Sequence, residues 1–245
     1  MTLDEILTGL FPNGRDIDVV GATIAGKASL TDGGPIHVLG ITQGQPLGVD
    51  EAIALAEHVI EIVRTDDRAP ILFLVDSASQ RMSRRDELLG LSEYLSHLAK
   101  ALLLAEAKGH HTVGLLYGGS AAGAFIATAL ATGTLVAFPG AHPAVMDLPS
   151  MARVTKLPID VLKAKAEATP VFAPGLENMV RTGGIHDVWD DNAPLGPQLA
   201  AVLQRPQGQD DRARLGAERG GRRKAAEIAD RVVALAAASQ EAQHG

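Results

Sequence analysis

The residues that could do chemistry begin at a glycine pair, in the stretch YGGSAAGAFIATALATG (117–133). Gly118 and Gly119 lie where the strand-like residues 112–117 give way to a predicted helix, for which Ser120 is a good N-cap. The first turn of a helix leaves polarised N–H groups without partners, and glycine lets an oxygen atom come close to them. Such N–H groups could form an oxyanion hole, which stabilises negative charge that develops during a reaction.

A purely structural role explains the same residues. A Gly-Gly pair between a strand and a helix also makes a tight turn, and Gly123 and Ala124 would let the helix pack closely. The spacing GGxxxGA differs from the dinucleotide-binding pattern GxGxxG, and no acidic residue follows about 20 positions later. Both the oxyanion hole and the packed turn stay open at this point, and we expect no nucleotide here.

The charge pattern around this stretch limits what it can be. Between Lys108 and Asp147 there is no Asp, Glu, Lys or Arg. A membrane span needs about 20 continuous apolar residues, but Gly and Pro interrupt this run too often, so we predict a buried helix instead. His110 and His111 are adjacent rather than one helical turn apart, and the chain has no cysteine, so we predict no metal site.

The composition favours one large domain over residues 1–245, with Ala, Leu, Val and Ile filling a core in which aromatic residues are only 3% of the chain. A net charge of −7 argues against a nucleic-acid partner. The first residues, 1–16, lack the basic start and long apolar core of a signal peptide, so we expect the cytoplasm.

Strand-like and helix-like segments alternate around the glycine pair and predict an α/β fold of repeated ββα units. Ser83 and Asp86 form a capping-box pattern, and the helix after them is expected to bury Leu88, Leu91, Leu95, Leu98 and Leu102. The polar segment 204–221 has the composition of a mobile connection, with its arginines on a solvated face. We predict strands at 16–26, 35–42, 69–76, 112–117, 134–138 and 144–148. We predict helices at 49–64, 83–108, 120–132, 158–168 and 221–239.

The chain resembles a known family. Its strand, glycine-rich turn and small-residue helix are similar to those of the crotonase-like superfamily, which includes enoyl-CoA hydratases, Clp proteases and carboxyltransferase subunits. Residues 77–110 and 146–190 are very similar to the gamma subunit of biotin-independent malonate decarboxylase. The resemblance covers roughly residues 15–190 and implies a crotonase-like (ClpP/crotonase) spiral of ββα units.

The resemblance implies decarboxylation of malonyl-S-acyl-carrier protein to acetyl-S-acyl-carrier protein, in a site shared with a homologous beta subunit. A phosphoribosyl-dephospho-CoA arm on the carrier protein would supply the thiol, and this chain would bind no cofactor itself. Loss of CO2 leaves an enolate, and one N–H donor to its oxygen is worth about 3–4 kcal/mol. The beta subunit's hole would hold the thioester while this chain's hole faces the carboxylate. The implied donors are the backbone groups of Gly118, Gly119, Gly123 and Ala124.

The resemblance also implies groups that contact the substrate. Arg153 and Lys156 would orient a carboxylate or meet the carrier's arm, and Asn178 would donate a hydrogen bond, although each could equally be a surface or turn residue. Ser120 and Met146 complete the implied set. Without its partner, the chain is expected to form a homo-oligomer.

The sequence departs from its relatives at several positions. The Clp nucleophile and histidine correspond to about Ala121 and Leu148, so peptidase activity is not expected, and nothing aims His142 at Ser120 as a substitute pair. The decarboxylase pattern has Ser-Gly-Gly near residues 122–124, where this chain has Ala-Gly-Ala. A hydratase or isomerase would need paired carboxylates, and only Asp147 is nearby. The remaining alternatives are a non-catalytic scaffold subunit and a related acyl-CoA carboxyltransferase subunit.

Overall fold

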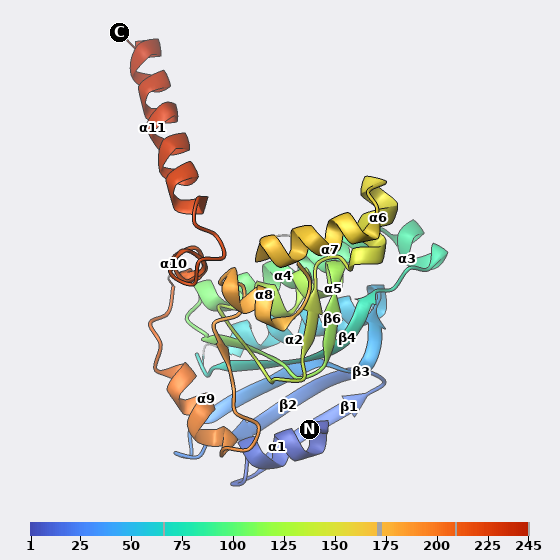
Figure 1. The fold of residues 1–245 in the computed structure, drawn as a ribbon. Coiled ribbons are helices and arrows are strands. Elements are labelled where there is room, and N and C mark those ends of the chain that lie inside the picture. Colours follow the sequence, from blue (N-terminus) through green and yellow to red (C-terminus); the bar gives the residue numbers. More distant parts are fainter. Residues whose placement is uncertain (66, 171–172, 209, 245) are drawn as a thin grey trace.

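A twisted sheet with helices on both faces forms the body of the chain in the computed structural model, which describes residues 1–65, 67–170, 173–208 and 210–244 (Figure 1). The sheet has seven strands in the order β1-β2-β3-β4-β5-β7-β9. The first two pairings are antiparallel and the remaining four are parallel. These strands are β1 (Arg15–Val20), β2 (Thr23–Ser29), β3 (Pro35–Leu47), β4 (Ile71–Gln80), β5 (Thr112–Leu116), β7 (Thr134–Ala137) and β9 (Asp187–Val188).

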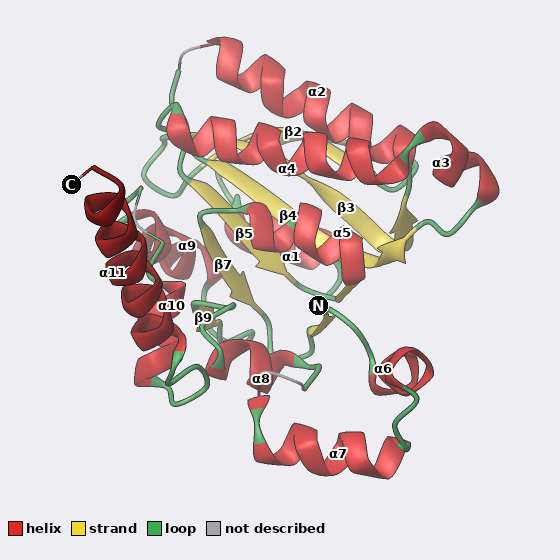
Figure 2. Cartoon of the chain, turned by 90° about the horizontal axis from the view of Figure 1, so that it is seen from above, coloured by secondary structure: helices red, strands yellow, loops and turns green. Residues whose placement is uncertain are grey.

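A second, two-stranded sheet joins β6 (Gly119–Ala121) to β8 (His142–Ala144) in parallel. The helices lie above and below the large sheet, and the C-terminal one projects away from the body (Figures 1 and 2). They are α1 (Leu3–Leu10), α2 (Val49–Thr65), α3 (Arg84–Leu89), α4 (Leu91–Ala107), α5 (Ala122–Ala127), α6 (Leu148–Thr155), α7 (Ile159–Ala168), α8 (Leu176–Arg181), α9 (Leu195–Leu203), α10 (Arg212–Glu218) and α11 (Ala225–His244), with a short 3-10 helix at Ala129–Ala131.

Strand β4 shows how the sheet separates two apolar cores. Alternate side chains of a strand point to opposite faces. Ile71, Phe73 and Val75 join the core beneath α2, α4 and α5, whereas Leu72 and Leu74 join the core that α1 and α9 cover. A continuous apolar run is therefore needed in this strand, because both of its faces are buried.

The predicted α/β class is confirmed, and three ββα successions occur in the described part of the chain: β2-β3-α2, β5-β6-α5 and β7-β8-α6. The predicted strand 16–26 is instead two strands, because the chain turns back at Gly21, whose φ is +60°. The predicted helix 83–108 is broken at Gly90, whose φ is +83°. That break leaves Leu88 77% exposed, contrary to the prediction, while the other four leucines named for this helix are buried as expected.

The region after the glycine pair also differs from the prediction. Helix α5 begins at Ala122, not at residue 120, and Ser120 lies in β6 and caps nothing. The predicted strand 144–148 is wrong, because β8 ends at Ala144 and Asp147 caps α6 by accepting the Ser150 N–H at 2.7 Å. The last helix begins at Ala225 rather than at residue 221.

The polar segment 204–221 contains helix α10, so the expectation that its arginines form a solvated face is wrong for two of them. Arg212 donates to the carbonyl groups of Leu130 and Thr132. Arg219 donates to three carbonyl oxygens, those of Val180 (2.9 Å), Ile185 (2.8 Å) and His186 (2.7 Å). These bonds fasten the segment to the end of α8 and to the entry of β9. Its mobility stays a prediction.

The charge-free stretch between Lys108 and Asp147 is divided among β5 to β8 and α5. No helix in the described ranges combines the length and the apolar character that a bilayer crossing requires.

Replacing Arg219 by Met is expected to lower the free energy of unfolding by about 2–4 kcal/mol. Each hydrogen bond from a charged donor is worth about 1.5–3 kcal/mol, and water replaces part of what the substitution removes. Urea denaturation of the isolated chain measures the change. The matched control is Arg231→Met on the exposed face of α11, which should change stability by no more than about 0.5 kcal/mol. Equal effects of the two substitutions would contradict the anchoring role of Arg219.

Candidate functional site

The segments that carry the predicted site residues meet at the carboxyl ends of the parallel strands, which is where open α/β sheets bind ligands. In the small sheet Gly119 lies opposite His142, and Ser120 lies opposite Pro143. The N–H of Gly175, which precedes α8, donates to the Pro143 carbonyl at 2.9 Å. Three stretches far apart in sequence, 118–124, 142–146 and 175–181, are therefore neighbours.

The glycine pair is needed because the protein's own atoms occupy the space beside it. A side chain at Gly118 would collide with the carboxylate of Asp76, and one at Gly119 would lie 2.7 Å from His142 Nε2. The Asp76 carboxylate accepts the Gly119 N–H at 3.1 Å through one oxygen and the Gly44 N–H at 3.1 Å through the other. It thereby joins the turn after β5 to the bend within β3.

A second side chain of β4 occupies the start of α5. Gln80 Oε1 accepts the Gly123 N–H at 2.9 Å. Ala124 is fully buried against the core. The predicted donors Gly119 and Gly123 thus already have acceptors in this structure, and their catalytic role stays a prediction that requires Asp76 and Gln80 to move aside.

Ser120 lies inside the protein rather than in an open site. Ser120 is only 2% exposed, and its Oγ lies 2.9 Å from Ser77 Oγ. This hydrogen bond ties β6 to β4. A direct contact between Ser120 and substrate, expected from the sequence, does not fit this burial, and the conceivable pairing with His142 is replaced by the pairing with Ser77.

The four other predicted substrate contacts lie on or beside β8, α6 and α8. Met146 is 39% exposed just after β8. Arg153 and Lys156 are exposed on α6 and at its end, where Lys156 is the left-handed C-cap. Asn178 donates to the Pro174 carbonyl at 3.1 Å, which matches the turn role left open for it. Arg153 and Lys156 therefore remain surface cations, available to a partner or substrate.

Sequence reasoning missed the acceptors on β4. Asp76 is the first charged residue after the buried run ILFLV, and Gln80 ends the same strand. A polar residue that directly follows a buried parallel strand lies at the edge where sites form, and this signal could have identified Asp76. Nearby, burial raises the pKa of Tyr117 to about 12, and its hydroxyl donates to Thr42 at 2.7 Å.

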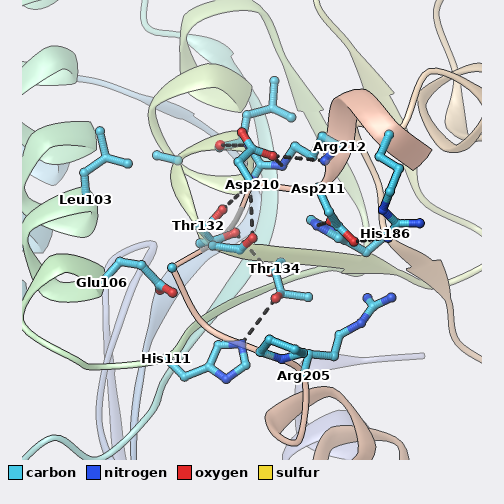
Figure 3. Close-up of a pocket in the computed structure, with 16 residues that line it drawn as sticks. Leu103, Glu106, His111, Thr132, Thr134, His186, Arg205, Asp210, Asp211 and Arg212 are labelled. Atoms are coloured by element: carbon cyan, nitrogen blue, oxygen red, sulfur yellow. Dashed lines mark hydrogen bonds and ion pairs between the residues drawn. The ribbon is translucent and has the colours of Figure 1, made fainter. Parts of the chain in front are cut away.

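A concave region of about 500 Å³ lies at the opposite, amino ends of β5, β7 and β9 (Figure 3). Its polar groups largely satisfy one another: His111 Nε2 lies 3.2 Å from Thr134 Oγ1, and Asp211 lies 3.2 Å from His186 and 2.8 Å from Arg214. This region attaches α10 to the sheet and contains none of the predicted site residues. Burial holds the pKa of His111 and of His186 below its usual value, and Arg212 further lowers that of His186.

Among the residues that the structure describes, no three His, Asp or Glu side chains gather as metal ligands would. His110 and His111 are buried separately, with His110 Nδ1 2.8 Å from the Ala69 carbonyl.

Comparisons with known proteins give one family match and several similar proteins. The profile described as malonate decarboxylase gamma subunit (MdcE) matches residues 42–236. The malonyl-S-ACP:biotin-protein carboxyltransferase MADD of Malonomonas rubra is 26% identical over 196 residues, which span 72% of this chain and 67% of MADD. A chain in the structure of the Pseudomonas malonate decarboxylase MdcD-MdcE hetero-dimer matches with 25% identity and a TM-score of 0.73, over 93% of this chain and 96% of that chain.

The same fold occurs in a Pseudomonas malonate decarboxylase hetero-tetramer in complex with coenzyme A. The match has 23% identity and a TM-score of 0.79, over 94% of this chain and 97% of that chain. The predicted crotonase-like spiral of ββα units is confirmed.

The stability of the chain is expected to fall as the pH drops below about 6.5, the usual pKa of histidine. The unfolded chain binds protons there, whereas the native chain keeps His111 and His186 neutral until the pH reaches their lowered pKa values, below which the loss levels off. Each imidazole contributes up to about 1.4 kcal/mol per pH unit.

Urea denaturation between about pH 7.5 and about pH 5 measures this dependence. His111→Gln should flatten it, and His97→Gln, at an exposed position of α4, should not. A slope that His111→Gln leaves unchanged would contradict the assignment.

Proposed function

Because the chain belongs to the malonate decarboxylase gamma subunit family, we propose that it works as that subunit, paired with a homologous beta subunit, in the decarboxylation of malonyl-S-acyl-carrier protein to acetyl-S-acyl-carrier protein. The observation that carries the proposal is the match, over 93% of this chain, to a chain of the MdcD-MdcE hetero-dimer structure. The thiol belongs to a phosphoribosyl-dephospho-CoA arm on the carrier protein, and this chain binds no cofactor of its own. The expected compartment is the cytoplasm.

The surface around the glycine-rich turn fits a protein partner. Helix α6 buries none of its residues, and its Val154 is 68% exposed. Helix α3 exposes Leu88 at 77%, and Met82 just before it is 83% exposed. Both helices lie at the same end of the molecule (Figures 1 and 2). Apolar side chains concentrated beside a site support an interface there, since short helices need packing to be stable.

Within this shared site, the chain positions the substrate and leaves catalysis to the beta subunit, because Asp76 and Gln80 already accept the N–H groups of Gly119 and Gly123. The enolate oxygen then meets donors of the beta subunit, and this chain closes the site, excludes water and presents surface cations such as Arg153 to the substrate carboxylate. This second, scaffold-like assignment rests on those two hydrogen bonds. A catalytic hole that uses the Gly119 or the Gly123 N–H needs the acceptor on that group to turn away.

Co-purification with the beta subunit, followed by CO2 release from malonyl-S-acyl-carrier protein, tests the pairing. The complex should turn over and neither subunit alone should. Leu88→Asp is expected to weaken the complex at least about 30-fold, because a central interface residue costs about 2 kcal/mol or more when removed.

The matched control is Leu104→Asp. Leu104 is exposed near the C-terminal end of α4, the end away from α3, so this substitution should leave assembly and turnover intact. Full turnover by this chain without the beta subunit would contradict the proposal, as would an unweakened Leu88→Asp complex.

A further inference from the structure

The concave region at the amino ends of β5, β7 and β9 holds hydrogen-bond donors that the protein leaves unused (Figure 3). Its walls come from the end of α4, from residues at or just before the start of these three strands, and from the connection that leads into α10. Its volume of about 500 Å³ is within the range of small-molecule sites. The predicted site residues lie at the opposite edge of the sheet, so this region is separate from the candidate site.

The carboxylates of this region already have partners. Three of them line it, and so do three arginines. Asp211 lies 2.8 Å from Arg214. Glu106 Oε2 accepts both the N–H and the hydroxyl of Thr112, at 2.8 and 2.7 Å, and Asp210 accepts a backbone N–H at the start of α10 at 3.1 Å. The negative charges are therefore matched in number and engaged by the protein's own donors.

Three donors, in contrast, have no acceptor among the residues that the structure describes. The half-buried Arg205 side chain forms neither an ion pair nor a hydrogen bond there. His111 Nδ1 and Arg212 Nε are buried and also lack a hydrogen-bond partner. Asp210 Oδ1 is 3.7 Å from Arg212 Nε, which is too far for a hydrogen bond. Buried donors without acceptors are unfavourable, so a ligand that supplies oxygen atoms would stabilise this region.

Arg205 lies near both buried imidazoles of the region. Burial is the main cause of the lowered pKa of His111 and of His186, and the Arg205 charge lowers both further, so both rings are neutral near neutral pH. In the tautomer in which the Thr134 hydroxyl donates to Nε2 across 3.2 Å, His111 Nδ1 carries a hydrogen and is a donor. One unpaired positive charge beside a neutral donor suits a monoanion better than a more highly charged phosphate.

We propose that this region binds the carboxylate of a small organic acid, which accepts hydrogen bonds from the Arg205 guanidinium and from His111 Nδ1, with its apolar part against Leu130 and Pro206. Arginine holds a carboxylate with two parallel hydrogen bonds, so it supplies both the charge and the orientation. The assignment is independent of the proposed function, because it involves no residue of the candidate site.

A ligand here would fasten α10 to the sheet. Arg212, at the start of α10, and Arg219, just after its end, already donate to backbone carbonyl groups that precede β7 and β9. The ligand adds Arg205, from the connection before α10, to this attachment. A ligand that binds only the folded chain stabilises it increasingly as the ligand concentration rises, so a bound carboxylate reduces the opening of α10.

Calorimetric titration of the full chain with sodium butyrate tests the site. Arg205→Gln is expected to raise the Kd for butyrate at least about tenfold, because it removes the charge and the paired donors while keeping a polar side chain. Arg205 bonds to no described residue, so the urea midpoint of this variant without butyrate should equal that of the wild type. The matched control is Arg64→Gln, the same change at an exposed position of α2, which contributes nothing to the region; it should leave the Kd within about twofold.

Butyramide, a neutral isostere of butyrate, and inorganic phosphate define the ligand class. Much weaker binding of both, together with the loss in Arg205→Gln, supports a carboxylate site. In hydrogen exchange, butyrate should slow the exchange of α10 amides in the wild type and in Arg64→Gln but not in Arg205→Gln.

An unchanged Kd in Arg205→Gln, an equal loss in Arg64→Gln, or binding of butyramide or phosphate as tight as that of butyrate would overturn the proposal. So would a failure of butyrate to bind the wild type or to protect α10.

Discussion

The carboxylate of Asp76 is the constraint on which the glycine-rich turn depends. It accepts N–H groups from two separate turns, at Gly44 and at Gly119, and its bulk is what excludes a side chain at Gly118. The hydrogen bond to the Gly119 N–H is partly buried, and a buried N–H without an acceptor would cost about 1–3 kcal/mol, so this carboxylate stabilises the turn after β5. Gln80 does the same for Gly123. The end of β4 thereby holds the bend within β3, the turn after β5 and the start of α5.

The arrangement of layers explains why this edge of the sheet is also the interaction edge. The parallel strands are buried on both faces, so they can offer polar groups only at their ends. At the amino ends, His111, Asp211 and Arg214 are largely paired internally and attach α10. At the carboxyl ends, α3 and α6 leave apolar side chains exposed. A homologous subunit that covered these side chains would complete an enclosed site.

Local periodicity was sufficient to predict α2 and the buried parts of β3 and β4, because their apolar spacing is continuous and their burial follows from it; both strands extend beyond the predicted ends, to Leu47 and Gln80. It did not predict α6, which has only eight residues and buries none of them, and the sequence there predicts a strand at 144–148 instead. Periodicity did not predict the helix break at Gly90 either, because the leucines on either side of it keep helical spacing. Local patterns could not predict that Asp76 occupies the space beside the glycine pair, because Asp76 and Gly119 are 43 positions apart. The glycines identified the place, but the sequence did not reveal what occupies it.

The most direct test of this account is the structure of the beta–gamma complex with a malonyl thioester analogue that cannot lose CO2. We expect the Gly119 N–H still to donate to Asp76 and the Gly123 N–H to Gln80, with the thioester oxygen held by the beta subunit. A thioester or carboxylate oxygen within hydrogen-bond distance of the Gly119 or Gly123 N–H, with Asp76 or Gln80 turned away, would contradict it. That result would give this chain a catalytic hole of its own.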